Sequence, residues 1–125
     1  MTAPRAKANP MSTTPEKTPQ RFYAAACQTD FPAAETRADI PSRVDRMCEI
    51  IEQTVTGYQP FFDIRLLAFP EFAHAVPAYP TAAELLEKLA IPVPNEHTER
   101  YENLAKRLGC YIQTGSFIEG DEAYP

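Results

Sequence analysis

The stretch Leu66-Leu67-Ala68-Phe69-Pro70-Glu71-Phe72 constrains the fold more than any other part of the chain. Its four leading apolar residues are bounded by turn-forming residues, which predicts a short buried strand covered on both faces in a parallel sheet. Pro70 ends this strand, because proline has no N–H for the ladder and holds the preceding residue extended. Glu71 therefore falls just past the carboxyl end of the strand, at the edge where open α/β sheets gather functional groups.

Glu71 is a candidate general base. A glutamate that leaves an apolar strand and precedes Phe72 is expected to be partly desolvated. Desolvation raises the pKa of a carboxyl group toward the range in which it accepts a proton near neutral pH. The competing interpretation is an ordinary loop acid, because many surface loops carry a glutamate.

Strand and helix patterns alternate along the chain, which predicts an α/β fold with parallel strands and right-handed crossovers. Residues 22–28 form the first predicted strand, and residues 110–116 form the third, continuing into Phe117 and Ile118. Turn chemistry at 119–121 suggests that 117–125 is one arm of a hairpin whose partner strand is missing.

Three helices are predicted between the strands. Apolar residues at spacings of three and four indicate a long helix that begins at Arg37 and ends at Gly57. Thr81 to Glu84 fits a capping box that opens a short helix through Ala90. Asn95 then caps another helix, which ends at Gly109. Its apolar stripe is Tyr101, Leu104, Ala105 and Leu108.

Composition limits the chain to one ordinary soluble domain with an atypical leader. Of the 125 residues, 44% are hydrophobic and 23% are charged. Residues 1–21 are rich in proline and hydroxyl side chains and carry a net charge of +3, which leaves −8 for residues 22–125. We expect a disordered leader before an acidic body, and an acidic body argues against nucleic acid as a partner. No apolar run is long enough to span a membrane, so we expect a cytoplasmic protein.

The cysteines and histidines give weaker signals. Cys27, Cys48 and Cys110 are odd in number and widely spaced, which favours reduced thiols that act as small buried hydrophobic residues over a disulfide framework. His74 lies three residues beyond Glu71, but no third orienting group is evident, so we interpret it as a surface or pocket-lining residue. His97 is assigned to an exposed helix face. That face also carries Glu96, Glu99 and Glu102. We expect no metal site and no cofactor.

The strand that ends in Phe69-Pro70-Glu71 resembles the opening of the nitrilase superfamily, the carbon-nitrogen hydrolases. The resemblance extends from Phe22 to Glu119, through the first strand, the long helix and the stretch Thr114-Gly115-Ser116-Phe117. It implies that Glu71 is the general base of a Glu, Lys, Cys triad. It also implies that the chain is the first half of a four-layer α-β-β-α sandwich, with 22–125 a partial domain truncated at its carboxyl end.

The function implied by the resemblance is hydrolysis of a non-peptide carbon-nitrogen bond in a small amide, carbamoyl compound or nitrile. No counterpart of the family's lysine and cysteine motifs is present, so the 125-residue chain alone is expected to be inactive. The resemblance also implies a homo-oligomer. Two alternatives remain: a non-catalytic relative that acts as an interaction protein, and an unrelated small α/β binding module.

Overall fold

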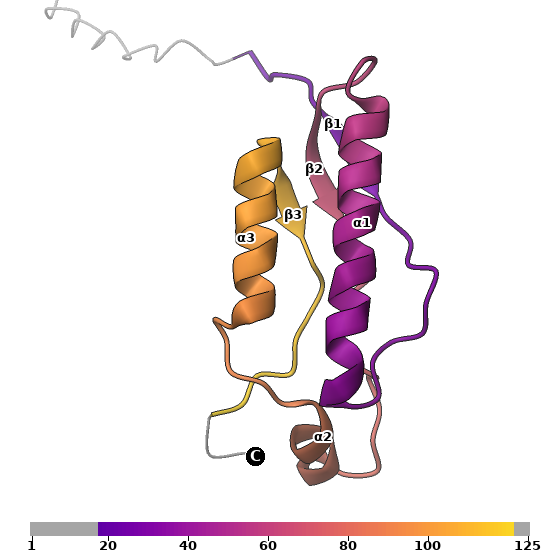
Figure 1. The fold of residues 1–125 in the computed structure, drawn as a ribbon, viewed down its shortest axis with the longest axis vertical. Helices are drawn as coiled ribbons and strands as arrows, with labels where there is room; N and C mark the ends of the chain where they lie inside the picture. The colour runs from indigo at the N-terminus through magenta and orange to yellow at the C-terminus, as the bar shows by residue number, and fades with distance from the viewer. Residues whose placement is uncertain (1–17, 122–125) are drawn as a thin grey trace, which may run out of the picture.

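The computed structural model describes residues 18–121 and confirms the α/β class. Three parallel strands form one sheet in the order β1-β2-β3, with β2 in the centre (Figure 1). Strands and helices alternate as predicted. In chain order the elements are β1 (Tyr23–Ala26), the 3₁₀ helix η1 (Arg37–Asp39), α1 (Ile40–Tyr58), β2 (Ile64–Ala68), α2 (Ala82–Leu89), α3 (Glu96–Leu108) and β3 (Tyr111–Gln113).

The strands are shorter than predicted because the two ladders, β1 with β2 and β2 with β3, extend over only a few residues. β1 covers 23–26 instead of 22–28, and β3 covers 111–113 instead of 110–116. Each ladder continues by one hydrogen bond. The Cys27 N–H donates to the Ala68 carbonyl at 2.8 Å, and the Phe69 N–H donates to the Gln113 carbonyl at 3.0 Å. Beyond these bonds the chains diverge, and Gly115 at φ 86° turns the third segment out of extended geometry.

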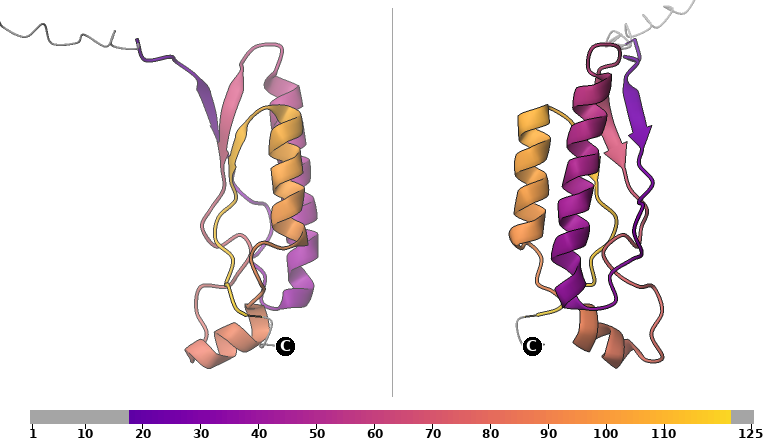
Figure 2. Two further views of the ribbon diagram at one scale, coloured as in Figure 1. Left: turned by 90° about the vertical axis from the view of Figure 1, so that its left-hand side faces the viewer. Right: turned by 45° about the vertical axis from the view of Figure 1, so that its right-hand side comes forward.

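Both long helices lie on the same face of the sheet, so the prediction that β2 is covered on both faces is wrong. Figure 2 shows α1 and α3 side by side on one face, with the opposite face open. A sheet whose strands follow one another in a single direction places every right-handed crossover on the same side. Leu67 is fully buried beneath the helices, whereas Leu66, pointing the other way, is only half-buried.

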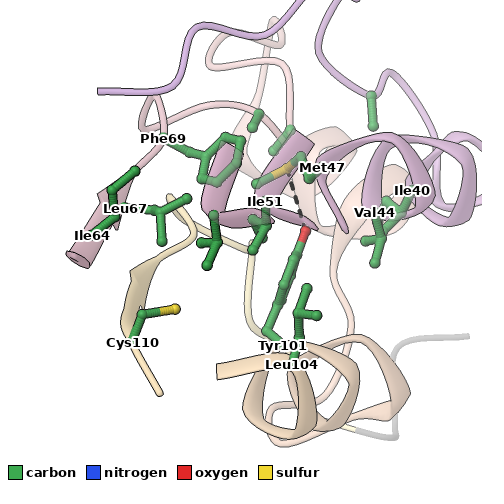
Figure 3. Packing of buried hydrophobic residues seen from close by; sticks show 14 of the residues in the cluster. Ile40, Val44, Met47, Ile51, Ile64, Leu67, Phe69, Tyr101, Leu104 and Cys110 are labelled. Atoms are coloured by element: carbon green, nitrogen blue, oxygen red, sulfur yellow. Dashed lines mark hydrogen bonds between the residues drawn. The ribbon is translucent and has the colours of Figure 1, made fainter. Parts of the chain in front are cut away.

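The core lies between the sheet and the two long helices (Figure 3). The predicted apolar stripe of α1 supplies its largest share, because residues at spacings of three and four fall on one helix face. Fully burying one such aliphatic side chain contributes about 1.5–3 kcal/mol. The buried residues of these elements include Ile40, Val44, Met47, Ile51, Val55, Leu67, Tyr101 and Leu104, with Phe69 just beyond β2.

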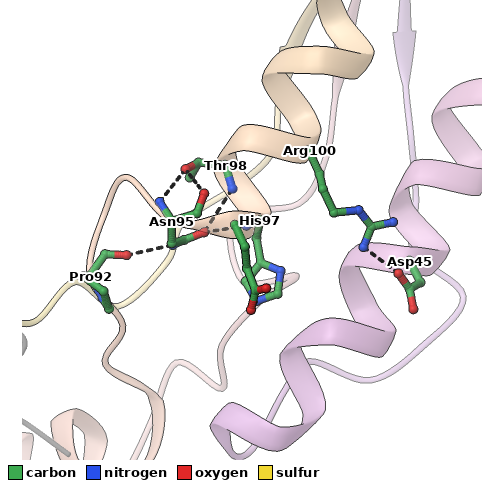
Figure 4. Close-up of polar contacts among 7 residues, drawn as sticks. Asp45, Pro92, Asn95, His97, Thr98 and Arg100 are labelled. Carbon is green, nitrogen blue, oxygen red and sulfur yellow. Dashed lines mark hydrogen bonds and ion pairs between the residues drawn. The ribbon is translucent and has the colours of Figure 1, made fainter.

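The helix ends follow local chemistry with one exception. The Asn95 side chain accepts hydrogen bonds from the N–H groups of His97 and Thr98, at 2.8 and 3.0 Å, as expected of a helix cap (Figure 4). Gly109 ends α3 with φ 66°. Gly57, however, does not end α1, which continues through Tyr58. Its φ is not positive, so it lacks the left-handed conformation by which a glycine stops a helix.

Two predictions concern the ends of the chain. The leader prediction for 1–21 lies outside the described residues except for residues 18–21, which are exposed and carry no regular structure. Of the predicted hairpin arm 117–125, residues 117–121 are described, and they form no strand of their own. Ile91 forms an isolated parallel bridge with Glu119, in which the Ile91 N–H donates to Ile118 and the Gly120 N–H donates to Ile91. The segment after β3 is therefore paired with the link between α2 and α3.

Candidate functional site

Glu71 lies where the sequence places it, at the carboxyl end of the central strand. β2 ends at Ala68, Phe69 is buried, and Pro70 and Glu71 begin a turn. The expected desolvation of Glu71 is not found, because Glu71 is exposed. Phe72 does not cover the carboxylate, as its own side chain is 40% exposed. Within the described residues, no apolar side chain shields the Glu71 carboxylate from water.

The backbone of Glu71 is held by the segment that follows β3. The Ser116 N–H donates to the Glu71 carbonyl at 2.7 Å. Gly115 makes this contact possible, because a Cβ atom there would lie 2.4 Å from the Pro70 carbonyl oxygen and 2.9 Å from that of Glu71. The sequence contained one signal of this role, a glycine near the end of the predicted third strand, where backbone can approach backbone closely.

His74 is a core residue, so its interpretation as a surface or pocket-lining side chain is wrong. It is 1% exposed, and its Nε2 lies 2.8 Å from the Tyr101 hydroxyl. The Tyr101 hydroxyl in turn donates to the sulfur of Met47 at 3.3 Å (Figure 3). The His74 ring stacks on Phe117, with ring centroids 4.0 Å apart. Its hydrogen-bonded partner is thus Tyr101, and these contacts anchor the loop that carries Glu71.

His97 is also buried, which corrects its assignment to the exposed face of α3. It is 8% exposed, because its ring turns inward toward Phe117 at a centroid distance of 6.3 Å. Phe117 therefore has two imidazole rings as neighbours. Burial, and to a lesser extent the neighbouring His97, lowers the pKa of His74 to about 4, while a contact with the Ser116 backbone opposes the change. His74 is consequently neutral at pH 7.

The acidic residues of α3 lie on its solvent-exposed side, as predicted. Glu96, Glu99 and Glu102 are all exposed. Glu102 pairs with Lys106 one turn later at 2.6 Å, and this hydrogen bond lowers the pKa of the Glu102 carboxyl.

The three cysteines are free, and none has the environment of an activated nucleophile. Burial raises the pKa of the thiols of Cys27, Cys48 and Cys110. A hydrogen bond from Thr54 acts in the opposite direction at Cys27, but burial outweighs it. Activated cysteines have lowered pKa values, so these thiols behave as packing residues.

Two grooves on the described surface lie away from Glu71. One, of about 590 Å³, runs between α1 and α3 and is lined by charged side chains, among them Asp45 and Arg100, which form an ion pair (Figure 4). The other, of about 460 Å³, lies between β1 and the second half of α1 and is lined by Tyr23, Tyr58 and Phe62. Neither groove is lined by Glu71, so they do not form a substrate pocket around it.

No protein-family model matches the chain. Between residues 18 and 121, no helix is both long and apolar enough to cross a membrane. In the same part of the chain, no three histidine, cysteine or acidic side chains gather as a metal ion would require.

Proposed function

We propose that the chain is the amino-terminal part of a hydrolase that cleaves non-peptide carbon-nitrogen bonds, with Glu71 as its general base. A cysteine thiol attacks the carbon of an amide, carbamoyl group or nitrile, and Glu71 accepts the thiol proton. A lysine stabilises the anion that forms. For an amide, collapse of this anion expels ammonia, which takes up the proton held by Glu71, and leaves a thioester on the cysteine; water then hydrolyses the thioester to the acid and the free thiol. The cysteine and the lysine belong to the part of the fold beyond this chain.

The placement of Glu71 carries the proposal. The residue follows the central strand of a parallel sheet at its carboxyl edge, where such sheets concentrate functional groups. Its carbonyl is bonded to Ser116, at the exit of the neighbouring strand. An ordinary loop acid has no need of a backbone fixed from a second strand, whereas a general base must be held within hydrogen-bonding reach of its proton.

The open face of the sheet also supports the proposal. Phe22 and Tyr111 are 61% and 76% exposed, and with Leu66 they line a groove of about 550 Å³ on that face. A four-layer sandwich requires such a face, because its two sheets pack together while their helices point outward. A second sheet over this face would supply the walls that Glu71 lacks here.

The proposal includes a cytoplasmic homo-oligomer that acts on a small amide, carbamoyl or nitrile substrate and uses no cofactor. The same open face favours one alternative, a non-catalytic relative that pairs through it with another copy of the fold. Turnover separates the two functions, because only the hydrolase needs an ionised Glu71.

The test is single-turnover acylation of the complete enzyme by a small amide. We expect Glu71→Gln to slow acylation by about 10²- to 10⁴-fold, because glutamine keeps the size of the side chain but accepts no proton. The control is Glu119→Gln, since Glu119 is also exposed and lies after β3. Thermal melts exclude unfolding. Normal acylation by Glu71→Gln would reject Glu71 as the base. The 125-residue chain alone should show no turnover.

A further inference from the structure

The loop that carries Glu71 is attached to the rest of the fold at both of its ends and at Glu71 itself. Phe69 donates to Gln113 at 3.0 Å, and Val76 donates to Ala34 at 2.8 Å. Between them, the Ser116 N–H meets the Glu71 carbonyl at 2.7 Å. The bond to Ser116 is therefore the one that sets the orientation of the Glu71 backbone, and with it the direction in which the carboxylate leaves the sheet edge.

Gly115 controls whether that bond can form. Its φ of 86° belongs to the left-handed region, and its missing side chain leaves room for the Pro70-Glu71 backbone. A methyl group at 2.4 Å from the Pro70 oxygen and 2.9 Å from the Glu71 oxygen would overlap both. Both atoms belong to the backbone, so the overlap can be relieved only if the turn or the glycine segment shifts.

The residue after Ser116 fixes the same segment from the other side. Phe117 stacks on His74 at 4.0 Å, and His74 lies on the Glu71 loop three residues further along. The stacked rings of Phe117 and His74, together with the Ser116 bond, join two chain segments more than 40 residues apart in sequence.

We propose that Gly115 is a positioning residue for Glu71, acting through the Ser116 bond. The inference rests on the proposed role of Glu71 as general base. Gly115 touches no reacting atom. It keeps the Pro70-Glu71 peptide within reach of Ser116, and a displacement of about 1 Å at such a position can cost roughly 100-fold in rate.

Gly109 provides a matched control for the substitution Gly115→Ala. Both glycines have positive φ, 66° at Gly109 and 86° at Gly115, so alanine introduces backbone strain at either position. A Cβ at Gly109 meets no atom within 4 Å. Any difference between Gly109→Ala and Gly115→Ala therefore reports the contact with Pro70 and Glu71.

The first measurement uses the 125-residue chain. Hydrogen exchange of the Ser116 amide should be at least about 10-fold faster in Gly115→Ala than in Gly109→Ala, because the bond to Glu71 is lost. The Glu71 amide resonance should move only in Gly115→Ala. Equal exchange rates and an unmoved Glu71 resonance would overturn the inference, whatever the chain's function.

The second measurement uses the complete enzyme. Gly115→Ala should lower kcat by about 10- to 100-fold with little change in KM, whereas Gly109→Ala should keep kcat. Rates are expressed per folded site, counted from the burst of acylation. If Gly115→Ala does not fold, Phe117→Leu takes its place, because it retains Gly115 and weakens the ring contacts of Phe117 with His74 and His97. We expect it to lower kcat several-fold.

The outcomes separate the two proposals. One outcome is that Glu71→Gln loses turnover while Gly115→Ala, or Phe117→Leu where that variant is used, keeps its kcat. This outcome would overturn the positioning role and keep the proposed function. Normal turnover in Glu71→Gln would overturn both.

Discussion

The backbone N–H of Ser116 donates a 2.7 Å hydrogen bond to the carbonyl of Glu71, across the exits of two neighbouring strands. β2 and β3 have already separated at this point, so the bond is not part of their ladder. It closes the gap between two turns and leaves the Glu71 side chain free to face solvent. A fixed backbone beneath an exposed carboxylate is an arrangement suited to a group that must meet a substrate.

The hydroxyl of Tyr101 should contribute measurably to stability. Tyr101→Phe leaves Nε2 of the buried His74 without a partner, which should lower the free energy of unfolding by about 1–3 kcal/mol. Urea denaturation measures the change. Tyr111→Phe is the control, because Tyr111 is 76% exposed and should change the free energy of unfolding by less than about 0.5 kcal/mol. Equal effects of the two variants would contradict the buried Tyr101–His74 bond.

Stability should fall as the pH is lowered from 6.5 to 4. The folded-state pKa of His74, about 4, lies below its ordinary value of 6.5, so the unfolded chain binds the proton more readily. Neutral His74 makes its full contribution to the free energy of unfolding above pH 6.5. This contribution is lost as the pH falls toward 4, by about 3 kcal/mol in total.

Denaturation at several pH values in the wild type and in His74→Gln checks this dependence. The variant should lose most of the slope between pH 6.5 and 4. Asp30 and Asp39, whose carboxyl pKa values are lowered by hydrogen bonds with Arg46 and with Thr36, act at lower pH, below their ordinary value of 3.8. An unchanged slope in His74→Gln would show that other groups cause the acid sensitivity.

The cap of α3 should contribute more to the free energy of unfolding than the cap of α2. Asn95 accepts two backbone hydrogen bonds and donates a third to the Pro92 carbonyl at 2.8 Å, so Asn95→Ala should cost about 1–2 kcal/mol (Figure 4). Thr81 accepts a single bond of 3.2 Å at an exposed position, and Thr81→Ala should cost about 0.5 kcal/mol. Thermal melts that rank the two variants in the opposite order would contradict this assignment.

The open face of the sheet should make the isolated chain prone to self-association. Because Phe22 and Tyr111 expose aromatic surface there, the chain should bind a hydrophobic dye or self-associate in sedimentation experiments. Tyr111→Thr should reduce both effects. Phe61→Ser serves as the control, because Phe61 is 77% exposed but lies in the turn between α1 and β2. A chain that stays monomeric and binds no dye would contradict the prediction.

Local sequence chemistry predicted the elements better than it predicted their surroundings. Asn95 and Gly109 bound α3 as expected, because a cap and a left-handed glycine act within one helical turn. The end predicted at Gly57 is wrong, since a glycine near a helix end is compatible with helical φ as well. The one-sided cover of the sheet depends on crossover handedness and strand order, and no single segment encodes strand order.

In the candidate site, too, local features were predictable and the surroundings set by distant segments were not. The position of Glu71 after β2 follows from Pro70 and the apolar run, both of which are local. Its exposure was not predictable, because what covers a side chain depends on segments distant in sequence. The burial of His74 and His97 likewise depends on Phe117, which lies at least 20 residues beyond either histidine.

The row formed by Met47, Tyr101 and His74 also determines where a proton resides. The Tyr101 hydroxyl has one proton and two neighbours that can accept it, the Met47 sulfur at 3.3 Å and Nε2 of His74 at 2.8 Å, so the tautomer of His74 decides which of them receives it. Met47→Leu would remove the sulfur acceptor and leave Nε2 as the partner for this proton. With Nε2 accepting, the ring carries its own proton on Nδ1, in keeping with the contact between His74 and the Ser116 backbone. A thioether on α1 thus competes for one hydroxyl proton with an imidazole on the loop that bears Glu71.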